Sequence, residues 1–384
     1  MQYKISRCMS IFTVALFLGS SIYAASVPGA PDIAASAHIL IDATTNRVLS
    51  EDNIDEALAP ASLTKMMTSY VAAAEIAAGR FSLDEMVEIS VKAWRTPGSK
   101  MFIREGTKVL MSDLLQGLIV QSGNDASVAI AEHIAGSEGA FADMMNQHAK
   151  ALGMNSSHFE NATGLPNNNH YTTARDLAVL SRALIADYPE HYKMYSQRSF
   201  KFNGIDQPNR NRLLARDRSV DGIKTGFTNA AGYCLVASAV RDDMRLISVV
   251  LGTDSDEARM RESQKLLSYG FRYYQTQNLY DENVTLKTAE VWYGQADQLN
   301  LGLENPVVLT LPRGRYEDLE AETDVTRIVK APISAGDELG EIRIKLDDKV
   351  VHRAPLIALD SIEEAGFFKS TGHGIYLLFS ELMN

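Results

Sequence analysis

A serine and a lysine three residues apart open the first long apolar segment of the chain. Ser62 and Lys65 would share one face of a helix over 61–78, because residues three apart are neighbours on a helix surface. A serine beside an amine can act as a nucleophile if burial or nearby cations keep the lysine neutral. Such a pair is expected about once by chance, and a solvated pair is the alternative. Lys65 is the only cation between Arg47 and Arg80, which favours the chemical interpretation.

A second short motif, Ser122-Gly123-Asn124, lies between two helical patterns, where a loop can enter a cleft. Its hydroxyl could relay a proton, and its amide could hold both a substrate carbonyl and a lysine ammonium. A helix N-cap is the alternative explanation.

The third motif, Lys224-Thr225-Gly226, is more selective, with about 0.05 occurrences expected by chance. It falls on a predicted strand edge over 223–227, where a glycine lets a ligand backbone approach closely. The lysine and the threonine would supply a cation and a hydroxyl donor for a carboxylate. A strand end with a turn glycine is the alternative. The three motifs together, in this order, are far rarer than any one of them.

Several elements must position these motifs. Strands are predicted over 38–42 and 47–50 and in a hairpin over 232–240 and 244–251, while helices are predicted over 112–120, 125–135, 139–151, 173–186 and 256–270. Strands from both ends of such a region commonly share one sheet, which predicts an α/β layer architecture. Beyond residue 275 only short alternating runs occur, at 284–286, 290–293, 307–311, 319–323, 342–346 and 350–351. They predict a small all-β domain.

Composition limits the ligand class. The 384 residues carry a formal net charge of -11, which argues against nucleic acid, since phosphate binding needs a clustered basic face. Two cysteines cannot form a disulfide framework or a cysteine zinc site, and no His-Glu-x-x-His pair occurs. We therefore expect no metal and no cofactor. Small anionic substrates remain compatible, because they need only one or two cations.

The first residues are typical of a secretory signal. Lys4 and Arg7 precede an apolar run over 11–18, followed by small residues at Ala24-Ala25. Cleavage after Ala24 would leave a mature charge of roughly -13 and a single thiol. An uncleaved amphipathic start is the alternative.

The motifs resemble those of the low-molecular-mass penicillin-binding proteins of the 5/6 type, which act as D-alanyl-D-alanine carboxypeptidases. The resemblance covers nearly the whole chain and includes PASLTKMM (60–67), QSGNDA (121–126), ARDLA (174–178), DGIKTG (221–226) and LPRG (311–314). It implies an α/β (α+β) penicillin-binding, β-lactamase-like transpeptidase fold, with an antiparallel sheet and a helical subdomain, followed by a small all-β sandwich domain. The expected divisions are a signal peptide at 1–24, a catalytic domain at 25–275, a β domain at 276–363 and an amphipathic membrane-anchor helix at 364–384.

The resemblance also implies a mechanism, that of a serine-type carboxypeptidase. Ser62 would attack the carbonyl between the last two D-alanines of a peptidoglycan stem peptide, and Lys65 would take its proton. Ser122 would pass a proton to the leaving D-alanine, and Asn124 would hold the substrate amide. The terminal carboxylate would face Lys224 and Thr225. A β-lactam would acylate Ser62 in the same way and deacylate slowly.

Backbone N–H groups of Ser62 and Phe227 would bind the oxyanion. Relatives carry histidine where Phe227 stands, a departure that bears on carboxylate contacts and pH dependence. Arg210 and Arg259 match secondary substrate-binding residues, with ordinary ion pairing as the alternative. Gly123 and Gly226 belong to the same binding set. Asp176 is expected either to order a loop beside the site or to cap a helix.

The resemblance further implies a periplasmic enzyme attached peripherally to the inner membrane through its tail, with roles in peptidoglycan biosynthesis and cell shape. The tail has few basic residues, so attraction to anionic lipid should be weak, and packing on the β domain is its alternative. Three rival functions stay open: a serine β-lactamase, a DD-endopeptidase and a non-catalytic peptidoglycan scaffold. A class A β-lactamase uses a glutamate to activate water, and none lies between Asn161 and Asp176.

Overall fold

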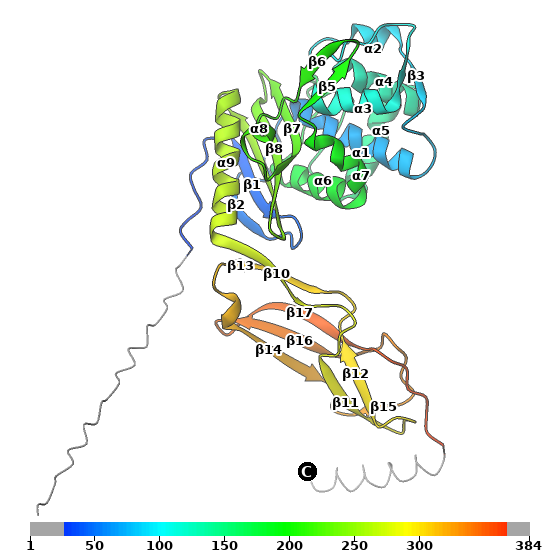
Figure 1. Ribbon diagram of the computed structural model, residues 1–384, viewed down its shortest axis with the longest axis vertical. Helices are drawn as coiled ribbons and strands as arrows, with labels where there is room; N and C mark the ends of the chain where they lie inside the picture. The colour runs from blue at the N-terminus through cyan, green and yellow to red at the C-terminus, as the bar shows by residue number, and fades with distance from the viewer. Residues whose placement is uncertain (1–26, 367–384) are drawn as a thin grey trace, which may run out of the picture.

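The computed structural model describes residues 27–366. Its first body is built on a five-stranded antiparallel sheet in the order β2-β1-β9-β8-β7, shown in Figure 1. The first and last thirds of this body therefore meet in one sheet, as the sequence predicts. The strands are β1 (Ala37–Asp42), β2 (Val48–Asp52), β7 (Val220–Thr228), β8 (Gly232–Arg241) and β9 (Met244–Thr253).

The sheet is buried on both faces. Successive side chains of a strand point to opposite faces, so neighbouring residues enter different cores. Ile39 and Ile41 face a large core shared with the helical layer, whereas Leu40 faces a second core. Helix α9 (Asp256–Tyr273) covers that second face with Leu266 and Leu267. The result is a three-layer α/β arrangement, and the helix predicted over 256–270 is confirmed.

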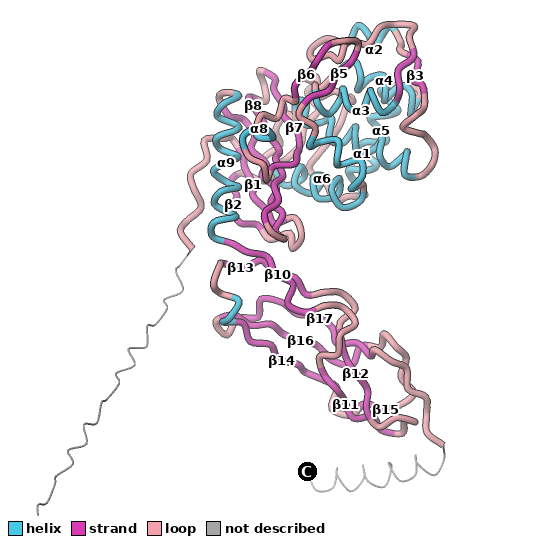
Figure 2. The backbone as a smooth tube through the Cα atoms, in the orientation of Figure 1, coloured by secondary structure: helices cyan, strands magenta, loops and turns pink. Residues whose placement is uncertain are grey.

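The helical layer covers the other face of the sheet (Figures 1 and 2). Its central helix is buried nearly all round, as its apolar sequence predicts. The layer contains the short 3₁₀ helix η1 (Ala61–Leu63), α1 (Thr64–Ala77), α2 (Val91–Arg95), α3 (Met111–Val120), α4 (Asn124–Ala135), α5 (Glu138–Ala151), α6 (Ala174–Asp187), α7 (Pro189–Tyr192) and the 3₁₀ helix η2 (Lys193–Ser196). Around it lie two small antiparallel sheets, of β3 (Met86–Glu88) with β4 (Lys108–Leu110) and of β5 (Ser199–Phe202) with β6 (Ile205–Pro208), while α8 (Leu213–Arg216) precedes β7.

After α9 the described chain forms strands and one short 3₁₀ helix, η3 (Tyr316–Asp318). A two-stranded ribbon and a six-stranded sheet in the order β14-β16-β17-β12-β11-β15 share one hydrophobic core. The all-β prediction is confirmed. The strands are β10 (Tyr274–Tyr280) and β13 (Val307–Pro312) in the ribbon, with β11 (Lys287–Trp292), β12 (Gln298–Gly302), β14 (Leu319–Val325), β15 (Val329–Lys330), β16 (Glu338–Leu346) and β17 (Lys349–Ala358) in the sheet.

Three details differ from the sequence predictions. The helix predicted from residue 61 begins as a 3₁₀ turn and becomes an α-helix only at Thr64. In the β domain, residues 284–286 form no strand, and β12 and β15 were not predicted. Strand β10 begins directly where α9 ends, with no glycine or proline to mark the change.

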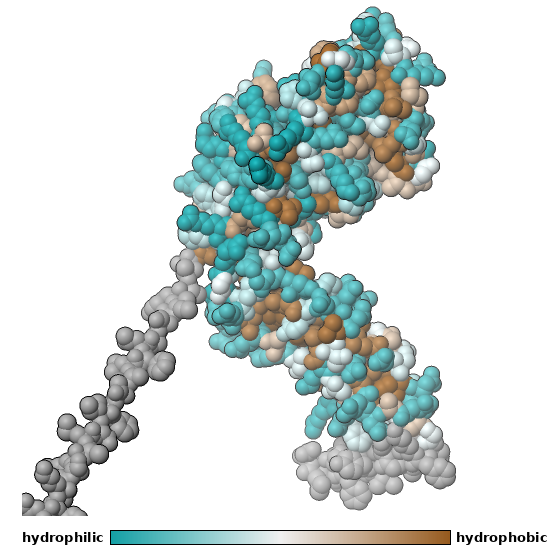
Figure 3. All heavy atoms as spheres, viewed as in Figure 1, coloured by the Kyte–Doolittle hydropathy of each residue, from teal (hydrophilic) through white to brown (hydrophobic). Residues whose placement is uncertain are grey.

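The surface seen in Figure 3 is mainly hydrophilic, with apolar side chains showing in patches. No helix among residues 27–366 is long and apolar enough to cross a membrane. The predicted signal and nearly all of the predicted anchor helix lie outside the described residues.

Candidate active site

Ser62 and Lys65 meet where η1 passes into α1. Ser62 is half-buried in η1, while Lys65 is the second residue of α1 and is fully buried. The Lys65 Nζ lies 2.9 Å from the Ser62 Oγ, within hydrogen-bond distance. Ala61, just before the serine, adopts a left-handed φ of 47°. Burial rules out the alternative of a solvated serine–lysine pair.

Two further acceptors surround the same amine. The Lys65 Nζ lies 2.7 Å from the Asn124 Oδ1 and 2.6 Å from the Thr163 carbonyl oxygen. Burial lowers the pKa of Lys65 to about 7, although the charge of Asp125 acts in the opposite direction. A neutral amine has two N–H donors and one lone pair. It can therefore donate to the two oxygens and still accept the serine proton.

The second motif forms the turn between α3 and α4. Ser122 has a left-handed φ of 65°, and its buried Oγ has no hydrogen-bond partner among the described residues. Gly123, not Ser122, occupies the N-cap of α4, so capping does not explain the serine. Asn124 donates from Nδ2 to the Pro97 carbonyl oxygen at 2.7 Å and keeps a second amide hydrogen for another acceptor.

The third motif lies within β7, an edge strand of the sheet. Lys224 and Thr225 are 2% and 6% exposed, and the Lys224 Nζ donates to the Thr225 carbonyl oxygen at 3.1 Å. Burial, followed by the charges of Lys65, Arg259 and Arg210, lowers the pKa of Lys224 well below its usual value. A bound carboxylate would offset this mutual repulsion between cations.

Gly226 is the last residue of the third motif, and Phe227 follows it. A side chain at Gly226 would approach Ala61, Pro60 and Leu63 at 3.2–3.3 Å, so the glycine lets β7 pack closely on η1. From the sequence, this glycine was expected to let a ligand backbone approach closely, but η1 and the residue before it occupy that space. Phe227 is 48% exposed, and its ring centroid lies 4.3 Å from that of Tyr233.

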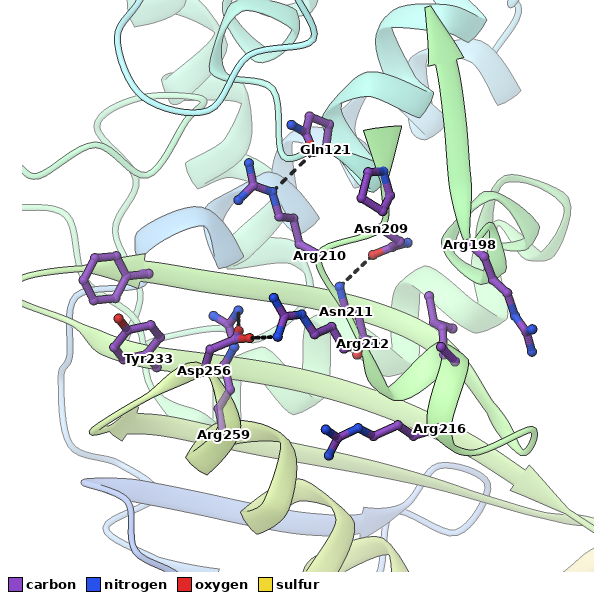
Figure 4. Close-up of a pocket in the computed structure, with 14 residues that line it drawn as sticks. Gln121, Arg198, Asn209, Arg210, Asn211, Arg212, Arg216, Tyr233, Asp256 and Arg259 are labelled. Atoms are coloured by element: carbon purple, nitrogen blue, oxygen red, sulfur yellow. Dashed lines mark hydrogen bonds and ion pairs between the residues drawn. The ribbon is translucent and has the colours of Figure 1, made fainter. Parts of the chain in front are cut away.

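The two arginines differ in burial and contacts (Figure 4). Arg259 is 7% exposed, donates to the Gly226 carbonyl oxygen at 2.9 Å and pairs with Asp256. Arg210 is exposed and donates to the Gln121 Oε1 at 3.3 Å. Arg259 thus forms an ion pair and a hydrogen bond to the backbone of β7. Arg210 contacts Gln121, the residue before Ser122.

A loop that the motifs do not include brings Thr163 to Lys65. The Asn161 Oδ1 accepts hydrogen bonds from the backbone N–H groups of Thr163 and Gly164. At Gly164, with φ of +83°, a Cβ would collide with the Ala61 carbonyl oxygen. The spacing of Asn161 and Gly164 signals a turn, but nothing in the sequence shows that its carbonyl reaches the lysine.

Asp176 holds the start of this loop. Its carboxylate accepts from the Ser156 N–H at 3.0 Å and the Ser157 Oγ at 2.7 Å. The N-cap of α6 is Thr173, whose side chain accepts from the Asp176 N–H. The loop-ordering expectation for Asp176 therefore fits better than side-chain capping.

Comparison with known proteins identifies the family of the chain. A family model for D-alanyl-D-alanine carboxypeptidase matches residues 24–255, and a model for the C-terminal domain of penicillin-binding protein 5 matches residues 274–364. The chain is 43% identical over 361 residues to D-alanyl-D-alanine carboxypeptidase DacC of Escherichia coli (strain K12). That match covers 92% of this chain and 90% of DacC.

Solved structures show the same similarity. Penicillin-binding protein 5 from Haemophilus influenzae matches with a TM-score of 0.83 and 38% identity, over 88% of this chain and 100% of that chain. Penicillin-binding protein D2 from Listeria monocytogenes, in an ampicillin-bound form, matches with a TM-score of 0.59 and 30% identity. The second match covers 64% of this chain and 100% of the other.

Proposed function

The chain belongs to the D-alanyl-D-alanine carboxypeptidase family, and on that premise we propose that Ser62 is its nucleophile and Lys65 the base that activates it. The enzyme is a serine-type D-alanyl-D-alanine carboxypeptidase. The observation that carries the assignment of residues is the buried Lys65 Nζ at 2.9 Å from the Ser62 Oγ, with a pKa lowered to about 7. A lysine in that state can accept a proton at neutral pH.

Acylation forms the bond between the Ser62 Oγ and the carbonyl carbon of the penultimate D-alanine. Lys65 takes the serine proton as this bond forms. The C–N bond then breaks, and a proton passes through Ser122 to the nitrogen of the departing D-alanine. Ser122 is suited to this relay, because its Oγ is buried and has no partner among the described residues. Water later cleaves the ester and returns the proton to Ser62.

The remaining residues would bind rather than react. Lys224 and Thr225 would hold the terminal carboxylate, with Arg210 and Arg259 adding positive charge near Lys224. Asn124 would present its second amide hydrogen to the substrate carbonyl. The N–H groups of Ser62 and Phe227 would receive the oxyanion. An edge strand suits this last role, since half of its N–H groups point away from the sheet.

A β-lactam offers the same carbonyl chemistry, and we infer that it acylates Ser62. Deacylation as fast as in a β-lactamase is not supported. The hydrogen-bond partners of the Lys65 Nζ are Ser62, Asn124 and Thr163, and none of them is a carboxylate that could activate water as in class A enzymes. Rapid release of hydrolysed penicillin by the purified protein would contradict this.

The test is release of D-alanine from a peptide ending in D-alanyl-D-alanine. We expect the wild-type protein to release D-alanine and to gain the mass of one penicillin, and Ser62→Ala to do neither. Equal activity in Ser62→Ala would contradict the assignment. An unmodified mass together with no D-alanine release in the wild type would favour the scaffold function.

Location is a separate part of the proposal. We propose export through residues 1–24, action on peptidoglycan in the periplasm and peripheral attachment to the inner membrane through residues 364–384. Fractionation of cells that express the full chain, beside a chain ending at residue 363, tests the attachment. Equal recovery of both from the soluble periplasmic fraction would contradict it.

A further inference from the structure

A pocket of about 800 Å³ adjoins the site, and its lining is rich in arginine. Figure 4 shows these side chains coming from the segment before β7 and from α9. Neither Ser62 nor Lys65 lines the pocket, so it lies beside the proposed reacting atoms and does not enclose them. We call it the arginine pocket, after Arg198, Arg210, Arg212, Arg216 and Arg259.

The arginine pocket is strongly cationic in a chain whose formal net charge is -11. Asp256 is the single carboxylate among its lining residues, which all lie in the described part of the chain, and it pairs with both Arg212 and Arg259. Arg216 pairs at 2.8 Å with Glu257 outside the lining. Five guanidinium groups thus face two carboxylates, and Arg198 and Arg210 have no carboxylate partner among the described residues, so positive charge remains in excess.

The pocket adjoins Lys224, the proposed partner of the substrate carboxylate, through two of its arginines. Arg210 and Arg259 lie close enough to Lys224 for their charges to act on it, and Arg259 also donates to the Gly226 carbonyl oxygen. Phe227 lies at the rim. A group that extends beyond the carboxylate at Lys224 would therefore enter the arginine pocket.

A single D-alanine leaving group carries one carboxylate, for which Lys224 with Arg210 and Arg259 already provides three cations. Arg198, Arg212 and Arg216 supply the other guanidinium groups of the lining. The pocket has both volume and charge that one alanine leaves unused.

We propose that the arginine pocket binds leaving groups larger than D-alanine that carry a second carboxylate. The inference rests on the proposed function and extends it to cleavage between D-alanine and an acidic amino acid or peptide. The chemistry is unchanged: the bond from the Ser62 Oγ to the carbonyl carbon forms, the C–N bond breaks, and the serine proton ends on the released amine. Water then hydrolyses the ester. The substrate class is an acidic cross-linked peptide, as an endopeptidase would cut.

Two peptides of nearly equal size separate charge from bulk. One ends in D-alanyl-D-glutamate and the other in D-alanyl-D-glutamine, and kcat/KM is measured for both, beside a peptide ending in D-alanyl-D-alanine. We expect the wild type to favour the glutamate peptide over the glutamine peptide by about fivefold, the size of effect that exposed ion pairs supply. The preference should shrink towards unity at about 0.5 M salt, because salt screens exposed charges.

Arg212→Gln and Arg216→Gln should each lower the ratio of the two kcat/KM values by about two- to threefold. The ratio is taken within one protein preparation, so partial loss of folded enzyme does not change it. Arg353→Gln is the matched control, since Arg353 is an exposed arginine of β17 that also pairs with a glutamate. It should leave the ratio unchanged.

Three results would overturn the inference while leaving the carboxypeptidase intact: equal cleavage of the acidic peptide and its amide counterpart, an unchanged ratio in both arginine variants, or cleavage of the D-alanine peptide alone. The proposed function fails separately, and the inference with it, if the wild type releases no D-alanine and forms no penicillin adduct.

Discussion

At the scale of single residues, the state of Lys65 depends on a match between donors and acceptors. Its Nζ has two oxygen acceptors, on Asn124 and Thr163, besides the Ser62 hydroxyl. A charged ammonium could also donate three hydrogens, but it could not take the serine proton. Burial favours the neutral amine over the ammonium, because it lowers the pKa of this lysine to about 7.

The first prediction concerns the pH dependence of acylation. In the proposed mechanism the neutral form of Lys65 is the base, so the rate of acylation by penicillin should rise with pH and level off above about 7, falling about tenfold per pH unit below it. Lys65→Arg should lower the rate by about 10³, since arginine stays charged. Stopped-flow measurement of acylation checks both.

Lys92→Arg is the matched control, because Lys92 is an exposed lysine of α2 that pairs with Glu138. It should keep the wild-type rate and pH profile. A rate for the wild type that does not change between pH 5 and 9 would contradict the role given to Lys65.

Spacing in the sequence was enough to propose these residues as the reacting groups, but it did not predict their surroundings. Ser62 and Lys65 are three apart and Ser122 lies in an interhelical turn, so local rules place them. The contact of Lys65 with the Thr163 carbonyl joins residues 98 positions apart. This contact depends on how the backbone of the loop packs, and backbone packing has no recognisable pattern in the sequence.

At the scale of elements, the loop from Asn161 to His170 contacts Lys65, the proposed base, through its backbone. Gly164 lies against the Ala61 carbonyl oxygen, next to Ser62. The side chain of His170, which is 4% exposed, lies 2.8 Å from the Thr64 Oγ1. The loop is thus fastened to η1 and α1 on either side of Ser62, which holds the Thr163 carbonyl at Lys65.

The second prediction tests the close packing at Gly164. In Gly164→Ala the new Cβ would collide with backbone, so the loop must move away from η1 and withdraw the Thr163 carbonyl. We expect a loss of about 3 kcal/mol or more in the free energy of unfolding and at least a roughly tenfold loss in acylation rate. Urea unfolding and penicillin acylation measure the two effects.

Gly153→Ala separates backbone strain from this collision. Gly153 also has a positive φ, +81°, but a methyl group at this position would meet no atom within 4 Å. The substitution should cost about 1–2 kcal/mol from strain alone and leave acylation unchanged. Equal effects of the two substitutions on acylation would show that packing of the loop on η1 does not position the base.

The third prediction concerns acid stability. The Glu160 N–H donates to the His170 Nδ1, so Nε2 carries the hydrogen that Thr64 accepts. Burial lowers the pKa of His170 to about 4. The unfolded chain therefore binds the proton more readily, and stability should be lost as the pH falls from about 6.5 towards 4.

His170→Gln should weaken this dependence, because an amide keeps an acceptor and a donor but does not titrate. Thermal unfolding from pH 8 to pH 4 checks it. His191, whose pKa burial also lowers to about 4, should preserve part of the decline. A drop in Tm with acid as steep as in the wild type would contradict the contribution of His170.

Helices with a strong apolar periodicity were predicted well. Short strands that depend on hydrogen bonds to neighbouring strands were not. The apolar pattern places α4 and α6 within one residue of the observed starts. By contrast, β12 has two buried leucines, Leu299 and Leu301, in a stretch too short to distinguish from a loop. Its strand character comes from hydrogen bonds to β11 and β17.

At the scale of the whole molecule, the net charge of the chain is negative, whereas the local charge of the arginine pocket is positive. The acidic total argues against a nucleic-acid face, yet the arginine pocket concentrates five cations beside the site. These arginines lie at positions from 198 to 259 and meet only because the segment before β7 folds against α9. No sequence average could have located them.

The two bodies of the molecule are joined by hydroxyl groups. Asp42, fully buried at the end of β1, accepts from the Thr276 Oγ1 of β10 at 2.6 Å. The Thr276 Oγ1 lies 2.9 Å from the Thr310 Oγ1, which in turn lies 2.6 Å from the Thr45 Oγ1. Arg47 adds a bond to the Thr310 carbonyl oxygen. This network fixes the ribbon of β10 and β13 against the turn between β1 and β2.

The fourth prediction is that Thr276→Val loosens this junction. Valine keeps the shape of threonine but removes its donor, so one oxygen of the buried Asp42 carboxylate loses its bond. We expect a loss of about 1–3 kcal/mol in the free energy of unfolding and faster proteolysis within residues 274–280. Thr288→Val is the control, because Thr288 is an exposed threonine of β11. Proteolysis no faster than in that control would mean that apolar packing, not the hydroxyl network, holds the β domain against the catalytic body. A rigid junction would fix the direction in which the arginine pocket faces relative to the β domain.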